Sequence, residues 1–207
     1  MIEKSRKSPK QKRSKLTVNA LLEATTRILI QEGIEGLTTN RVAEIAGVSI
    51  GSLYQYFPNK MTLIAALIEQ HVAYELKTLT NLYIFWNKPI GEPLVRALIE
   101  KFIQIHLKDL KLTKLLHEQV SFLECRSALR KATKQFEKII VKMLDSHFQS
   151  NLSLSSLETK AFVLVNSIDA VVQLSLAENP ERLGTPVFLD ELVNMAMQTF
   201  IFSNTKC

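Results

Sequence analysis

The sequence predicts an all-α protein, and three observations lead to that prediction. Apolar residues recur at the three- and four-residue spacing of amphipathic helices through most of the chain. No segment alternates apolar and polar residues over the length of a strand. Glycine and proline number only six each in 207 residues, which leaves room for long uninterrupted helices. The length allows one domain or two small ones, each with a real core.

The N-terminal segment is strongly basic. Residues 1–15 hold seven basic residues and one acidic residue, a net charge of +6 that equals that of the whole chain. Because such a segment has little to bury, we expect residues 1–14 to be a disordered tail. It could be a solubilising terminus, or an arm that neutralises DNA phosphates or enters the minor groove beside the docked helix. The arm is favoured because residues 16–61 carry only three basic residues against four acidic ones.

The next three elements form one small unit. Apolar residues from Val18 to Leu29 have helical spacing, and Gly33 is expected to end that helix. Thr38 or Thr39 then caps a short helix whose buried side is formed by Val42 and its neighbours.

A tight turn and a second short helix follow. Gly47 supplies the left-handed conformation that ends the preceding helix, and Ser49 caps the next one. Leu53 and Phe57 give this helix a buried edge, and Pro58 stops it. A small polar and aromatic face without acidic residues is left pointing outward, which suits entry into a DNA major groove. It comprises Ile50, Gly51, Ser52, Tyr54, Gln55 and Tyr56.

These residues also carry a family resemblance, which covers about residues 15–75. The chain resembles the TetR/AcrR-type helix-turn-helix transcriptional regulators in the run Thr38-Thr39 and then Gly47-Val48-Ser49-x-Gly51-x-Leu53-Tyr54-x-Tyr56-Phe57-Pro58-x-Lys60. It departs from them at Ile50, where a polar or basic residue is common and where contact with a thymine methyl is the apolar substitute. No arginine lies between Ile50 and Phe57, so this helix cannot read guanine through arginine.

The resemblance implies a helix-turn-helix DNA-binding domain over residues 15–75, with its motif at 38–57. Base edges would be approached by Ile50, Gly51, Ser52 and Gln55, with Gln55 reading adenine. The expected contacts to the DNA backbone come from Thr38, Thr39, Arg41, Ser49, Tyr54, Tyr56 and Lys60. Lys60 follows a predicted cap at Asn59 and begins a long helix that reaches about Leu82, so it lies beside a positive helix end. Tyr54 and Tyr56 could instead brace the fold.

The remainder, residues 76–207, is predicted to be a helical effector-binding and dimerisation domain. A turn-rich break at 87–93 precedes a helix that starts near Leu94. Further helices are predicted at 114–122, 126–148, 161–177 and 188–202.

The last two predicted helices are apolar on more than one side, which indicates a second covering surface. We expect them to pair with a second copy in a four-helix, two-fold interface, through Val172, Leu176, Leu192, Met197 and Phe200. The alternative is that both helices are simply central in one chain. A membrane span is disfavoured because Asn166 and Asp169 interrupt the first of them.

No catalytic motif or metal-binding motif stands out, so we expect neither an enzyme nor a cofactor or metal. The two cysteines, Cys125 and Cys207, form neither a disulfide framework nor a zinc set. His71 and Glu75 are interpreted as a surface pair, and His106 and His117 as too far apart for one metal. Candidate effector residues are the polar or aromatic groups in apolar helices, Trp86, Phe102, His106, His117, Phe122 and Asp169.

The sequence thus predicts a cytoplasmic, homodimeric DNA-binding regulator, a repressor that leaves a palindromic operator when a small hydrophobic effector binds. Two alternatives remain open. One is a DNA-binding regulator with no small-molecule effector, gated by a protein partner or by its own abundance. The other, of a different class, is a helical lipid carrier or enzyme with a vestigial DNA-binding unit.

Overall fold

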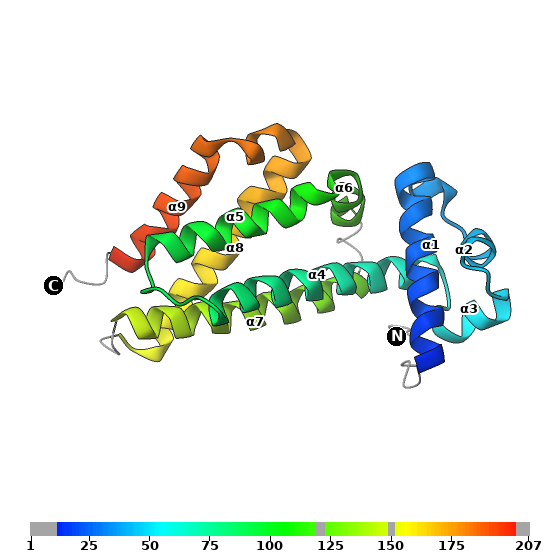
Figure 1. Cartoon of the computed structure of the whole chain (residues 1–207), viewed down its shortest axis with the longest axis horizontal. Helices are drawn as coiled ribbons and strands as arrows, with labels where there is room; N and C mark the ends of the chain where they lie inside the picture. The colour runs from blue at the N-terminus through cyan, green and yellow to red at the C-terminus, as the bar shows by residue number, and fades with distance from the viewer. Residues whose placement is uncertain (1–11, 119–122, 149–151, 202–207) are drawn as a thin grey trace. The chain divides into compact units, whose positions relative to one another are not determined.

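The computed structural model describes residues 12–118, 123–148 and 152–201, and within these ranges it contains helices and no strand. The predicted all-α class is therefore confirmed (Figure 1). The chain divides into two compact units. The first unit comprises Met1–Val72 and Lys111–Leu129, and the second comprises Ala73–Leu110 and Arg130–Cys207.

The first unit is built around the N-terminal helices. It contains α1 (Lys12–Gly36), α2 (Thr39–Ala46), α3 (Ile50–Tyr56) and the first half of α4 (Lys60–Ile84). Its core is formed by fully buried apolar side chains from all four helices, among them Leu21, Ile28, Val42, Leu53, Leu63 and Ile64, and by Leu37 between α1 and α2. Burial of several such side chains, each contributing about 1.5–3 kcal/mol, is what holds the short helices α2 and α3 in place.

The beginning and end of α1 differ from the predictions. The helix begins at Lys12, so residues 12–14, which we expected to belong to a disordered tail, are helical. Residues 1–11 lie outside the described part of the chain. Gly33 has a left-handed backbone (φ 73°), which interrupts the helix where the sequence predicts its end. One further helical turn follows, to Gly36.

A later segment of the chain also belongs to the first unit. Helix α6 (Leu110–Glu118) places Leu116 in the N-terminal core, with Leu112 and Leu115 packed against it. The predicted division at residue 75 assigned this segment to the C-terminal domain. The difference arises because the apolar stripe of α6 faces the core of the DNA-binding region, which no local pattern reveals.

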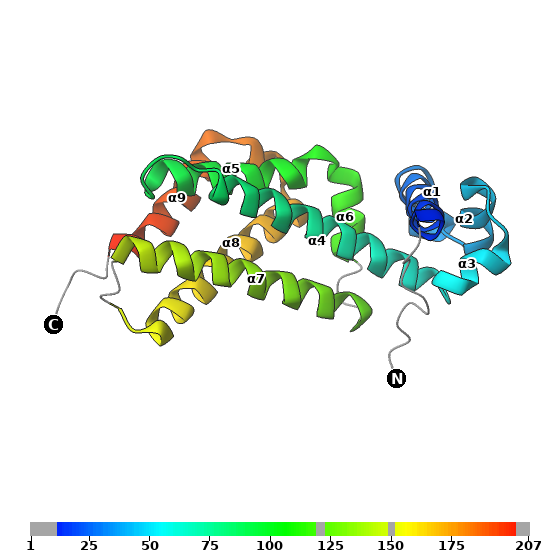
Figure 2. The same cartoon turned by 60° about the horizontal axis from the view of Figure 1, so that its bottom comes forward.

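The second unit contains the remaining helices: α5 (Glu92–Lys108), most of α7 (Leu123–Phe148), α8 (Leu154–Glu178), η1 (Pro180–Gly184), a short 3₁₀ helix, and α9 (Pro186–Ile201). Helix α9 packs along α5, and the second half of α4 runs beside α7 (Figure 2). Arg96 on α5 bonds Glu92 on its own helix and Asp190 on α9, both at 2.7 Å. Lys160 on α8 donates to the Thr199 carbonyl on α9 at 3.1 Å.

Helix α8 is long and apolar enough to cross a membrane, judged by length and composition alone, and it is the one such helix among the described residues. Several of its side chains instead form the core of the second unit, including Ala161, Val172 and Leu176. Asn166, near its middle, donates to Glu137 on α7 at 3.0 Å. These contacts place one side of α8 in the core of the second unit, and the other side is exposed.

Candidate nucleic-acid interface and buried polar cluster

The turn between α2 and α3 has the geometry that the sequence predicts. Thr38 caps α2 by accepting a hydrogen bond from the Arg41 amide at 3.2 Å. Gly47 ends α2 in the left-handed region (φ 66°), and its amide donates to the Glu44 carbonyl at 3.1 Å. A residue with a Cβ is strained in this conformation, so glycine fixes the angle at which α3 leaves α2.

Helix α3 is short but firmly held. The Ser49 hydroxyl accepts from the Ser52 amide at 3.1 Å and lies 2.9 Å from the Ser52 hydroxyl, which confirms the predicted cap. Leu53 and Phe57, the predicted buried edge, are 0% and 3% exposed. The backbone of this helix is therefore anchored at both ends, and its outward side is free to carry recognition groups.

The outward side is narrower than predicted. Ile50, Gly51, Tyr54 and Gln55 are exposed, and Ser52 is half-buried. Tyr56, however, is only 8% exposed and belongs to the core of the first unit. The prediction that Tyr56 points outward is wrong, because residue 56 follows Leu53 by three and shares its buried side.

Two side chains of α2, Thr39 and Arg41, already have partners within the first unit. The Thr39 and Tyr54 hydroxyls lie 3.1 Å apart, which couples the start of α2 to the middle of α3. Arg41 bonds Glu44 at 3.0 Å and lies 3.7 Å from Glu32. The hydrogen bond and charge of Glu44, with the charge of Glu32, raise the pKa of Arg41 above its usual value. Arg41 can therefore contact a phosphate only by releasing Glu44 and Glu32. Lys60 is exposed and is the first residue of α4.

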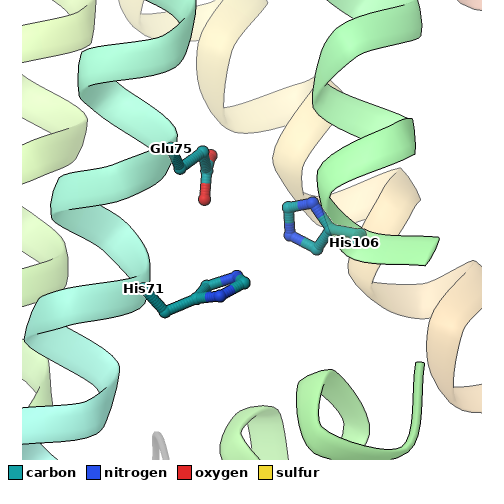
Figure 3. Close-up of side chains that lie close together, drawn as sticks. All are labelled: His71, Glu75 and His106. Carbon is teal, nitrogen blue, oxygen red and sulfur yellow. The ribbon is translucent and has the colours of Figure 1, made fainter. Parts of the chain in front are cut away.

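The second unit contains a polar cluster on three helices, in which His106 is buried and Glu75, Asp169 and Gln173 are half-buried. His106 on α5 is 2% exposed, and its Nδ1 lies 3.0 Å from the Phe102 carbonyl. Asp169 on α8 accepts from Gln173 at 2.6 Å. Glu75 on α4 faces His106, and a Glu75 carboxylate oxygen lies within 4.8 Å of a His106 ring nitrogen (Figure 3).

The charges of this cluster are perturbed by burial. Burial and the charge of Asp169 raise the pKa of Glu75 to about 8. Burial also raises the pKa of Asp169, although the bond from Gln173 acts in the opposite direction. Burial lowers the pKa of His106, which keeps the imidazole neutral near pH 7. Perturbed titratable groups that gather in one place are a common mark of a binding site.

Three of the six predicted effector residues lie near one another: Phe102 contacts His106, and Asp169 is near enough to His106 for their charges to interact. The Phe102 and His106 rings meet edge to face, 4.5 Å between centroids. Trp86 lies in the turn after α4, where its indole donates to the Pro89 carbonyl and Lys88 lies over its ring. His117 belongs to the first unit, and Phe122 lies outside the described residues.

Sequence reasoning missed Glu75 and Gln173. The interpretation of His71 and Glu75 as a surface pair does not fit, since both are half-buried. The available signal was a set of polar side chains on helices that are otherwise apolar. Asp169 and Gln173 are one turn apart on α8, and His71 and Glu75 are one turn apart on α4.

The residues predicted for a dimer interface lie mostly inside one chain. Val172, Leu176 and Leu192 are 0%, 2% and 4% exposed and belong to the core of the second unit, and Met197 packs against that core. The side chain of Phe200 lies outside the described part of the chain. The exposed apolar side chains of α8 are instead Leu154, Phe162, Val163, Val171 and Leu174.

Comparison with known proteins covers both parts of the chain. Residues 21–67 match the family described as "Bacterial regulatory proteins, tetR family", and residues 92–198 match "Tetracyclin repressor-like, C-terminal domain". The second match alone spans more than half of the chain and includes the polar cluster except Glu75.

Individual relatives agree with these matches. The nucleoid occlusion factor SlmA of Glaesserella parasuis serovar 5 (strain SH0165) is 26% identical over 115 residues, 56% of each chain, so the chain spans little more than half of that protein. The HTH-type transcriptional regulator SAR0097 of Staphylococcus aureus (strain MRSA252) is 23% identical over 93% of this chain and 99% of its own. A transcriptional regulator from Rhodococcus sp. Rha1 shares the fold, with a TM-score of 0.67, 16% identity and coverage of 89% and 96%.

Proposed function

This chain belongs to the tetR family of bacterial regulatory proteins and is a DNA-binding transcriptional regulator, and from that premise we propose that it is a homodimeric, cytoplasmic repressor. A palindromic operator would be its target, and a small effector bound in the second unit would release it. The proposal rests most directly on α3, whose exposed side is free of acidic residues and whose backbone is fixed by Ser49, Leu53 and Phe57. The regulator is proposed to have no enzymatic activity.

Helix α3 is proposed to enter the major groove, with Ile50, Gly51, Ser52 and Gln55 towards the base edges. Gly51 allows close approach because it carries no side chain, and Gln55 can make a paired contact with adenine. Phosphates would be held on either side of the groove by Thr38, Thr39, Ser49, Tyr54 and Lys60. Tyr56 is withdrawn from this set because it is buried. Arg41 remains a proposed phosphate contact, which it would make by releasing Glu44.

A second copy is proposed to pack on the exposed apolar side of α8. Phe162, Val163 and Leu174 are 57%, 55% and 56% exposed, which is unusual for three large apolar side chains on one helix of a helical domain. A two-fold contact through this side would bury all three on both copies. Two α3 helices spaced by about one DNA turn, ~34 Å, would then read a palindrome.

The effector is proposed to bind beside Phe102, His106 and Asp169 and to be small and largely apolar. Glu75 follows the first unit by three residues on α4, and His106 precedes α6 by four. A ligand that moves either residue therefore acts on a chain segment that continues directly into the DNA-binding core. The ligand must favour one arrangement of the two units over another, because equal affinity for both would shift nothing.

The test is a fluorescence anisotropy titration with DNA from upstream of the chain's own coding sequence, followed by footprinting on the same fragment. We expect tight, saturable binding and protection of two half-sites. A thermal-shift screen of small apolar compounds should identify one that raises the melting temperature and weakens that binding. Unchanged DNA affinity with every stabilising compound would count against effector release.

A second candidate is favoured by the likeness to SlmA, which its name describes as a nucleoid occlusion factor. The match of 115 residues is longer than the DNA-binding unit alone, so it includes part of the helical remainder. In this alternative the chain binds many chromosomal sites and is gated by a protein partner. Genome-wide mapping separates the two, because a repressor occupies few promoter sites and a nucleoid factor occupies many dispersed ones.

A further inference from the structure

The one basic side chain of α2 is surrounded by negative charge. The guanidinium of Arg41 lies 3.0 Å from the Glu44 carboxylate and 3.7 Å from that of Glu32. These three side chains together carry a net charge of −1. A DNA phosphate therefore meets no net positive charge at this place unless Arg41 leaves its partners. DNA binding alone gives no reason to collect two acids around a proposed phosphate contact.

The position of Glu32 depends on the two glycines at the end of α1. Gly33 follows it directly and interrupts the helix with a φ of 73°. A Cβ added to Gly36 would lie 2.4 Å from the Glu32 Cβ and 2.8 Å from its Oε2. The Glu32 side chain thus occupies space that a larger residue at position 36 would take. The contact between Glu32 and Arg41 is therefore determined by the backbone at the end of α1.

The pairing of Arg41 with the two carboxylates is weak enough to exchange. The side chains of Arg41, Glu32 and Glu44 are 45%, 40% and 70% exposed. Exposed ion pairs typically shift an equilibrium by about 2- to 5-fold. An attraction of this size reduces the gain from a phosphate contact without preventing it. The Arg41 backbone is fixed, because its amide donates to Thr38 at 3.2 Å, so only the guanidinium has to move.

We propose that Glu32 and Glu44 limit DNA affinity by competing with phosphate for Arg41. The inference rests on the proposed function, in which Arg41 contacts the DNA backbone. Phosphate contacts contribute to affinity whatever the base sequence, so an unpaired arginine would also strengthen binding to unrelated DNA. The two carboxylates reduce this sequence-independent part of the affinity. They are positioning residues, which act on DNA through Arg41.

The test is a fluorescence anisotropy titration of the purified full chain with a duplex of unrelated sequence, which makes it independent of the operator and the effector. Glu44→Gln should raise the affinity by about 2- to 5-fold. The slope of log affinity against log salt should become steeper by up to about 0.9, the value for one added phosphate contact. Arg41→Gln should lower the affinity. In the double variant, Glu44→Gln should lose most of its effect, because the arginine that it frees is absent.

Glu35→Gln is the matched control. Glu35 is an exposed carboxylate at the end of α1, three residues after Glu32, and it forms no ion pair with Arg41. Its replacement removes the same charge from the same unit and should change the affinity far less. Glu32→Gln is a second, independent variant, which should raise the affinity by less than Glu44→Gln because its contact with Arg41 is longer.

The possible failures are distinguishable. An affinity that Arg41→Gln leaves unchanged would overturn the phosphate contact itself, and the competition with it. An affinity that Arg41→Gln lowers, but that neither Glu44→Gln nor Glu32→Gln raises, would overturn only the competition. A rise in Glu35→Gln as large as that in Glu44→Gln would also overturn it, since the effect would then follow from the net charge of the unit. If Glu44→Gln does not fold, Glu32→Gln decides between these outcomes.

Discussion

Replacing Gly51 by alanine should strengthen the fold and weaken DNA binding, which separates the two roles of α3. Gly51 is the second residue of α3, and a Cβ added there meets nothing closer than the Ser49 hydroxyl, at 4.0 Å. Its backbone is not left-handed. Alanine in place of glycine in a helix is worth up to about 1 kcal/mol, and near a helix start we expect about half of that. Chemical denaturation should therefore show an equal or higher free energy of unfolding.

The methyl group of alanine at residue 51 would face the DNA in the proposed complex. An extra methyl in a closely packed contact costs roughly 1–3 kcal/mol, which is about 5- to 150-fold in affinity. Fluorescence anisotropy with the footprinted upstream fragment measures this loss. Native affinity in Gly51→Ala would refute the placement of α3 in the groove.

Gly47→Ala is the contrasting variant. A Cβ at Gly47 also meets nothing within 4 Å, but the residue is left-handed at φ 66°, so alanine should destabilise the fold by about 1–2 kcal/mol. The two glycines thus lie four residues apart and respond to the same substitution with opposite changes in stability. A destabilised Gly51→Ala would mean that the loss of DNA affinity reports unfolding and not contact.

Three other predictions follow from described contacts. Tyr54→Phe removes an exposed hydroxyl that lies 3.1 Å from the Thr39 hydroxyl, so the free energy of unfolding should change by less than about 1 kcal/mol. DNA affinity should fall, and equal anisotropy curves for Tyr54→Phe and the native protein would show that the Tyr54 hydroxyl does not contact DNA. Leu174→Glu should halve the sedimentation mass of a folded protein, whereas Val172→Glu, at a fully buried position, should unfold it; a dimeric Leu174→Glu would exclude this side of α8. Deleting residues 2–11 removes four basic residues, and the slope of log affinity against log salt should become shallower by about 2–4; an unchanged slope would show that the tail does not contact DNA.

The local elements of the DNA-binding unit were predictable because each depends on neighbours in sequence. Caps at Thr38, Ser49 and Asn59 use a side chain and the amide three residues later, and the left-handed conformation at Gly47 is a property of one residue. Leu53 and Phe57 follow from helical spacing alone. Tyr56 was misplaced because an aromatic residue with a hydroxyl suits both a buried position and a phosphate contact, and its surroundings decide between them.

Features that depend on contacts between residues distant in sequence could not be predicted in this way. Whether an apolar residue of α8 is buried in its own core depends on which helices cover it. Val172 is buried and Leu174 is 56% exposed, although they are two residues apart. The polar cluster joins residues 75, 106 and 169, which lie on three helices. A single sequence gives each of them as an isolated polar residue, and their mutual distances appear only in the fold. The assignment of α6 to the first unit is of the same kind.

Footprinting of the purified chain on the DNA upstream of its own coding sequence tests the central claim most directly. The account predicts two protected half-sites related by two-fold symmetry and spaced by about one helical turn. Both should weaken together in Gly51→Ala at the lowest concentration that gives full protection with the native protein. An evenly unprotected fragment, or protection that Gly51→Ala retains in full, would contradict it.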